Sequence, residues 1–184
     1  MAFPLLSRKM GVKAVLTRET IEAALTLLDA ELGRADQRAS LHLVGGAVMC
    51  LVFKTRESTR DVDAWFEATS AVRAAARRVA EALDLPDDWL NDAAKAYIPR
   101  DAHFEAWRSF PNLEILVADT RTLFVMKCAA ARTEEDAGDI RALAGALGLT
   151  TSHEALKLVA AYYPEDRLPV RTRLLLEELF HDRA

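Results

Sequence analysis

Two different hydrophobic spacings divide the chain near residue 120, and this division constrains the fold more than any other feature. Before residue 120, short strand-like segments alternate with helical ones, whereas the later segments have the spacing of amphipathic helices. We expect strands at 40–44, 60–66, 104–107 and 112–118. We expect helices at 17–34, 47–53, 70–83, 89–97, 121–132, 134–147 and 170–180, and after the capping box Thr151–Glu154. The pattern predicts an α+β fold with an all-helical C-terminal half.

The two halves are expected to fold together. No Gly/Ser-rich linker separates them, and no internal repeat is visible. A chain of 184 residues has room for one ordinary domain. We therefore expect an α/β core with an N-terminal helix at 1–120, and a helical region at 121–184 that packs on this core.

The formal net charge of −4 excludes a generic polycation that coats nucleic acid. An RNA partner would need a local basic patch, for which the candidates are Lys9, Lys13, Arg18, Arg73, Arg77 and Arg78. No apolar run approaches the roughly 18–20 residues that span a bilayer, so no membrane partner is expected. The first residues lack a signal-peptide pattern, and Cys50 and Cys128 lie in apolar surroundings typical of buried, reduced thiols. These features predict a cytoplasmic protein.

A glycine pair, Gly45 and Gly46, separates the predicted strand at 40–44 from the continuously apolar segment 47–53. We interpret that segment as a short buried helix, and a strand is the alternative that periodicity leaves open. A helix that begins at a glycine pair presents backbone N–H groups at its positive end, where phosphates bind. Most such pairs serve only a turn or close packing, so the pair indicates a phosphate site only together with other residues.

Two aspartates follow on the next predicted strand. Asp61 and Asp63 alternate with Val62, so both carboxylates project to one face while Val62 faces the core. Side-by-side carboxylates repel each other unless a cation lies between them. Oxygen ligands at this spacing suit Mg²⁺, with Mn²⁺ as the alternative. An isolated Asp-x-Asp is usually a solvated strand face, but together with the glycine pair it favours phosphoryl or nucleotidyl transfer.

These motifs resemble the minimal nucleotidyltransferase superfamily, whose signature is Gly-Gly or Gly-Ser followed after a short gap by Asp-x-Asp. Within the superfamily, the sequence is most similar to the toxin-type AbiEii/MenT group. Four segments carry the resemblance, at 41–47, 58–63, 85–92 and 123–140. The resemblance implies a nucleotidyltransferase fold, in which helices flank a small mixed sheet.

The resemblance also implies roles for individual residues. Gly45 and Gly46 would bind the triphosphate of an NTP, and Asp61 and Asp63 would hold Mg²⁺ and the α-phosphate. Superfamily members often have a third carboxylate on a later strand, and Glu114 is the candidate here.

Two residues depart from the superfamily pattern. Glu114 stands where Asp is commoner, and Ala47 lies at or near a position where many members have a phosphate-binding Ser. The first departure concerns the carboxylate that would act as general base on the attacking hydroxyl. The second removes a side-chain hydroxyl that would bind phosphate, whereas the backbone N–H groups are unaffected.

A lysine lies inside an apolar segment of the C-terminal half. Lys127 is surrounded by Leu123–Ala131, and a lysine inside a buried helix must reach solvent or an anion. In the toxin group, a lysine in this helix serves the triphosphate or the reaction, which implies a catalytic or nucleotide-binding role for Lys127. Arg132 and Asp139 are further candidates for nucleotide binding, with the surface and a helix first turn as their alternatives.

The implied activity is Mg²⁺-dependent transfer of a nucleoside monophosphate from an NTP to a hydroxyl. By resemblance, the acceptor is the 3′ end of tRNA, and the protein is the toxin of a toxin–antitoxin pair with a cognate antitoxin as partner. Two alternatives stay open at this point. The acceptor could be a small molecule or a partner protein, or the chain could be a non-catalytic binding module on the same fold.

Overall fold

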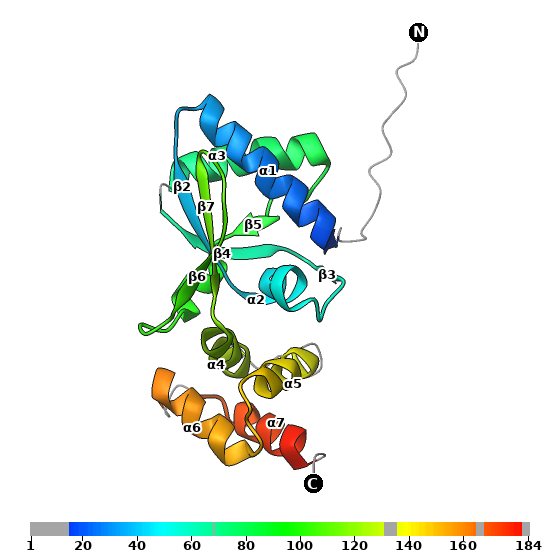
Figure 1. The fold of residues 1–184 in the computed structure, drawn as a ribbon, viewed down its shortest axis with the longest axis vertical. Helices are drawn as coiled ribbons and strands as arrows, with labels where there is room; N and C mark the ends of the chain where they lie inside the picture. The colour runs from blue at the N-terminus through cyan, green and yellow to red at the C-terminus, as the bar shows by residue number, and fades with distance from the viewer. Residues whose placement is uncertain (1–14, 68, 131–135, 165–167, 182–184) are drawn as a thin grey trace.

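The computed structural model describes residues 15–67, 69–130, 136–164 and 168–181, and the fold is α+β (Figure 1). The main sheet has five strands in the order β5-β4-β2-β7-β6. β2 runs parallel to β7 and antiparallel to β4, so the sheet is mixed. The strands are β2 (Ala39–Leu43), β4 (Val62–Phe66), β5 (Leu90–Asn91), β6 (Phe104–Ser109) and β7 (Leu113–Ala118). A separate antiparallel pair consists of β1 (Leu16–Thr17) and β3 (Ser58–Thr59).

Helices flank this sheet and make up the C-terminal half, as predicted. The N-terminal helices are α1 (Arg18–Arg34), α2 (Gly45–Val48), the π-helix η1 (Met49–Phe53), α3 (Thr69–Leu83) and the 3₁₀-helix η2 (Ala93–Tyr97). The C-terminal helices are α4 (Thr120–Ala130), α5 (Ala137–Ala146), α6 (Ser152–Tyr162) and α7 (Val170–His181). None of the helices in the described part of the chain is long and apolar enough to cross a membrane.

The two faces of the sheet have different surroundings. Alternate residues on one face are fully buried and pack with the apolar sides of α1 and α3, and they include Leu41, Leu43, Val62, Ala64 and Ile115. The opposite face carries Asp63, Trp65 and His42, which are only partly buried. Because side chains alternate along a strand, burial of the first face by α1 and α3 sends Asp63 to the second.

Helix ends follow local sequence signals. Thr17 caps α1, because its hydroxyl oxygen accepts a hydrogen bond from the Thr20 N–H at 3.3 Å. The predicted capping box is also present, since Glu154 N–H donates to Thr151 Oγ1 while the Glu154 carboxylate accepts from the Thr151 N–H. Segment 47–53 is helical, as preferred over the strand alternative, and it ends at Lys54 with a positive φ of 56°.

The helix predicted at 89–97 is wrong in its first half. Leu90–Asn91 forms β5, which pairs with β4 in parallel, and only Ala93–Tyr97 is helical, as a 3₁₀ turn. Asn91 explains the break, because its side-chain oxygen accepts a hydrogen bond from the Ala93 N–H at 3.0 Å. The preceding Trp89 is fully buried, and its indole N–H donates to the Ala76 carbonyl of α3 at 2.9 Å. Trp89 is therefore a packing residue between α3 and the start of β5.

The hydrophobic core continues from the sheet into the C-terminal helices. One cluster of buried side chains includes Leu43 of the sheet, Phe124 of α4, Ile140 of α5 and Leu176 of α7. Cys50 and Cys128 are both buried free thiols, as expected.

Candidate functional site

The glycine pair lies where β2 ends and α2 begins, at the end of the sheet that faces α4 and α5 (Figure 1). Gly45 has a φ of +68°, which favours glycine, and a Cβ there would lie 3.1 Å from Asp63 Oδ2. A Cβ on Gly46 would lie 2.4 Å from Thr59 Oγ1, closer than real Cβ contacts. The turn therefore requires glycine at both positions for steric reasons, and it brings its backbone against the Asp63 carboxylate.

The two aspartates lie beside this turn and next to β5. The Val44 N–H donates to the Asp63 carbonyl at 3.0 Å, which joins the end of β2 to the start of β4. Asp61 immediately precedes β4, and its Oδ2 accepts a hydrogen bond from the Asn91 side-chain amide at 3.1 Å. Asn91 also pairs with Asp63 in the strand register. Sequence reasoning assigned no role to Asn91, although it lies in one of the segments that carry the resemblance.

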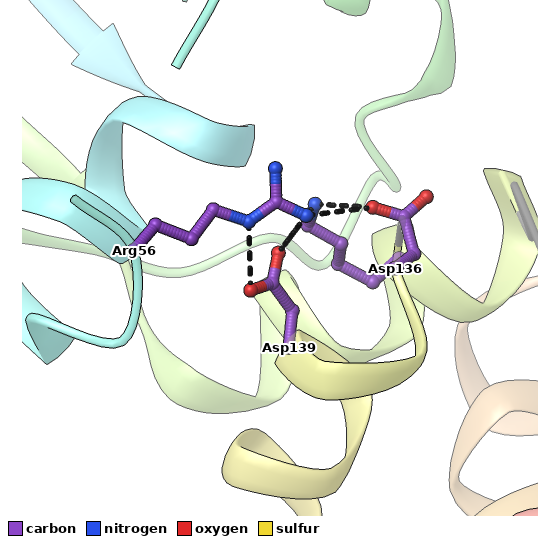
Figure 2. A network of polar contacts seen from close by, with 4 residues as sticks. Arg56, Asp136 and Asp139 are labelled. Atoms are coloured by element: carbon purple, nitrogen blue, oxygen red, sulfur yellow. Dashed lines mark hydrogen bonds and ion pairs between the residues drawn. The ribbon is translucent and has the colours of Figure 1, made fainter. Parts of the chain in front are cut away.

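A buried ionic cluster lies between the segment after η1 and helices α4 and α5 (Figure 2). Lys127 Nζ of α4 is 2.6 Å from Asp136 Oδ1 and 2.8 Å from Asp139 Oδ2. Arg56 binds Asp139 with two nitrogens, Nε at 2.9 Å and Nη2 at 2.7 Å. Lys127 thus finds anions rather than reaching solvent, and Asp139 joins the same cluster.

Arg56 is the residue of this region that sequence reasoning missed. Its Nη2 also lies 3.4 Å from Asp136 Oδ1, and its side chain is 25% exposed. Its partners lie eighty or more positions away in the sequence, so no local pattern identifies it. The available signal is its place between the glycine pair and the two aspartates.

Comparison with known families adds an independent observation. A family model described as "Nucleotidyltransferase of unknown function (DUF6036)" matches residues 23–162. The chain belongs to this nucleotidyltransferase family. The match covers the glycine pair, both aspartates and the ionic cluster, and it supports the superfamily rather than the toxin-type subgroup. No curated protein and no solved structure matched the chain.

The nucleotidyltransferase does not bring Glu114 to the aspartates. Glu114 pairs with Ser40 in the parallel register of β7 and β2, and its Oε2 accepts from Ser40 Oγ at 3.3 Å. Asp63 contacts Val44, which lies four residues beyond Ser40, so at roughly 3.3 Å per residue the offset is about 13 Å along the strands. At the level of Asp63, β7 carries the buried Ala118 instead of a carboxylate.

A cavity of about 710 Å³ in the nucleotidyltransferase also lies away from the aspartates. It is lined at the start of β2, the end of β4 and the β6–β7 turn, where Glu67, Glu114, Arg38 and Phe110 contribute side chains. His42 also lines the cavity, and the His42 ring packs on Trp65 and Phe104 with centroids 4.5 and 4.9 Å apart. The cavity therefore shares the open face of the sheet with Asp63 but occupies its opposite end.

Most of the predicted basic candidates in the described part of the nucleotidyltransferase are in ion pairs. Arg18 binds Glu22 at 3.1 Å, Arg73 binds Asp92 at 2.9 Å, and Arg78 binds Glu31. Arg77 is exposed on α3, which covers the face opposite Asp63. Lys9, Lys13 and the nucleotide-binding candidate Arg132 lie outside the described residues.

Proposed function

We propose that the protein transfers a nucleoside monophosphate from an Mg²⁺-bound NTP to a hydroxyl acceptor. The observation that supports this proposal is the closeness of the Gly45–Gly46 turn to Asp63, because the turn is the proposed phosphate-binding backbone and Asp63 is a proposed metal ligand. The family match to nucleotidyltransferases supports the same activity.

The residues at Asp61 and Asp63 fit Mg²⁺ by their chemistry. Both are carboxylates that are partly exposed, so water and phosphate oxygens can complete an octahedral shell. In the part of the chain that the structure describes, no group of three or more His, Cys, Asp or Glu forms a closed metal site. A metal ion that also binds a substrate needs coordination positions that the protein does not fill, and two carboxylates leave such positions. Mn²⁺ would bind to the same two ligands.

The chemical step is an in-line displacement at the α-phosphorus. The acceptor oxygen forms a bond to phosphorus, the bond from phosphorus to the bridging oxygen of the β-phosphate breaks, and pyrophosphate leaves while the hydroxyl proton passes to solvent. When bound, Mg²⁺ would neutralise charge that develops on the phosphate oxygens. Backbone N–H groups of the Gly45–Gly46 turn hold the phosphates, and Asn91 fixes the orientation of the Asp61 carboxylate.

For the acceptor, we propose the 3′ end of tRNA and a role as the toxin of a toxin–antitoxin pair. Support for this finer proposal is the resemblance of segments 41–47, 58–63, 85–92 and 123–140 to toxin-type nucleotidyltransferases. A cognate antitoxin protein would then be a partner.

A small-molecule acceptor is the second candidate, and one observation favours it. Arg18, Arg73 and Arg78 are in ion pairs, which lowers the positive charge available to an RNA backbone.

Transfer from labelled nucleotides tests the activity and the acceptor together. The protein is incubated with each α-labelled NTP, Mg²⁺ and either total RNA or an RNA-free extract of small molecules. Label that enters tRNA supports the first acceptor, and label that enters the small-molecule fraction supports the second. The double variant Asp61→Asn/Asp63→Asn should lose transfer, whereas Asp87→Asn, which changes an exposed loop aspartate, should retain it. Equal transfer by the double variant would contradict the proposed site.

A further inference from the structure

Arg56 presents two different edges of its guanidinium group to two parts of the protein. The edge formed by Nε and Nη2 binds both carboxylate oxygens of Asp139 at 2.9 and 2.7 Å. The remaining nitrogen, Nη1, points away from the two labelled carboxylates in Figure 2. A Cβ built on Gly46 would lie 3.8 Å from this Nη1, so the second edge lies at the glycine turn.

This arrangement differs from that of Lys127 in the same cluster. The Lys127 ammonium lies within 2.8 Å of both Asp136 and Asp139, and the residue is 8% exposed, so the two carboxylates hold its charge. A guanidinium is planar and carries five N–H donors, so it can bind one anion on one edge while it offers the other edge to a second anion. The Nε and Nη2 atoms of Arg56 bind Asp139, and its Nη1 lies beside the turn where we propose that phosphates bind.

We propose that Arg56 is a triphosphate-binding residue of the nucleotidyltransferase site, and that Asp139 is a positioning residue that holds it. Non-bridging oxygens of the NTP phosphates would accept hydrogen bonds from Nη1 beside the N–H groups of Gly45 and Gly46. The bidentate contact with Asp139 fixes the guanidinium plane before the substrate arrives, which reduces the ordering that binding requires. This inference rests on the proposed function and assigns Asp139 a role apart from substrate contact.

Because Arg56 is proposed to bind the triphosphate, substitution of Arg56 should weaken binding equally for NTPs with different nucleobases. The probes are inorganic tripolyphosphate and the four NTPs, with binding measured by titration calorimetry in the presence of Mg²⁺. Arg56→Lys keeps the charge but has a single ammonium group, which cannot serve Asp139 and the turn together. We expect this variant to bind tripolyphosphate and every NTP at least about tenfold more weakly, the size expected for one charge-assisted hydrogen bond. Arg121→Lys, which changes an exposed arginine of α4, is the matched control.

A measurement on the wild-type protein removes any dependence on how well the variant folds. Phenylglyoxal modifies accessible arginines, and peptide mass spectrometry reports modification at each one. Tripolyphosphate should protect Arg56 from phenylglyoxal while Arg121 is modified as before. Unchanged modification of Arg56 at saturating tripolyphosphate would overturn the inference.

The two levels of the proposal fail in different ways. If the wild-type protein binds tripolyphosphate and Arg56→Lys binds it equally well, Arg56 is only structural and the proposed function stands. If the wild-type protein binds neither tripolyphosphate nor any NTP, the proposed function fails and the inference with it. A purely structural Arg56 would lower the melting temperature of the free variant without changing the stabilisation that tripolyphosphate adds.

Discussion

Gly45 leaves no room for a side chain beside Asp63 at the junction between β2 and β4, because a Cβ on Gly45 would lie 3.1 Å from Asp63 Oδ2. The turn that we propose to bind phosphates therefore lies directly beside the strand that carries the proposed metal ligand. Any side chain at position 45 would disturb both the turn and the carboxylate.

Gly45→Ala should therefore impair both folding and metal binding. A non-glycine residue at the φ of +68° found here costs about 1–2 kcal/mol of unfolding free energy. The added methyl group would also displace the Asp63 carboxylate and weaken Mn²⁺ binding. Urea denaturation and Mn²⁺ titration measure the two effects. Gly145→Ala is the matched control, since its Cβ meets nothing within 4 Å and it should leave Mn²⁺ binding unchanged.

Asn91→Ala should weaken metal binding without removing a metal ligand. The Asn91 amide holds Asp61 Oδ2 at 3.1 Å, and loss of such a supporting hydrogen bond typically costs about 10–100-fold in metal affinity. Titration with Mn²⁺ gives the affinity, and Gln37→Ala, which removes an exposed amide, serves as control. A metal affinity within twofold of wild type would show that Asp61 needs no support from β5.

Glu114→Gln should retain nucleotidyl transfer. The register of β2 and β7 places Glu114 beside Ser40, at the end of the sheet away from Asp63. We expect kcat within about threefold of wild type, because a group outside hydrogen-bond reach of the reacting atoms cannot act as their base. A large loss of kcat with unchanged substrate binding would restore Glu114 as the third carboxylate.

Lys127→Met should destabilise the fold much more than Arg73→Met. Removal of Lys127 from the buried cluster leaves two carboxylates, Asp136 and Asp139, beside the single positive charge of Arg56, and the loss of one partner from such a cluster costs about 3–5 kcal/mol. The Arg73–Asp92 pair is more exposed, at 56% and 27%, and its loss should cost about 0–1 kcal/mol. Urea denaturation of both variants makes the comparison. Equal losses would mean that the buried cluster contributes little.

Stability should fall on acidification partly because of His42. Burial lowers the pKa of His42, while the Trp65 backbone and the carboxylates of Glu114 and Glu67 partly oppose this shift. The unfolded chain then binds the proton more readily, so the unfolding free energy decreases as the pH falls through the unfolded value of about 6.5. His42→Phe should lose less stability between pH 7 and pH 5 than the wild-type protein, as measured by urea denaturation at both values.

Local signals in the sequence were sufficient for much of the fold. The capping box at Thr151 and the helical spacing of α1 depend on neighbours within a few residues, and the structure confirms them. β5 was predicted as part of a helix, because the strand at Leu90–Asn91 exists only through its pairing with β4. A two-residue strand has too little pattern of its own to be recognised.

The same distinction applies to the candidate site. The order of the residues determined that a strand leads into a glycine turn, and that Asp61 and Asp63 share one side of Val62, because turns and strand alternation are local properties. Only the tertiary structure decided that Glu114 lies at the far end of the sheet, since strand register depends on how β2 and β7 pair. It also decided that Arg56 meets Asp139, 83 positions away, because α5 must first pack against the segment after η1 for the two charges to meet.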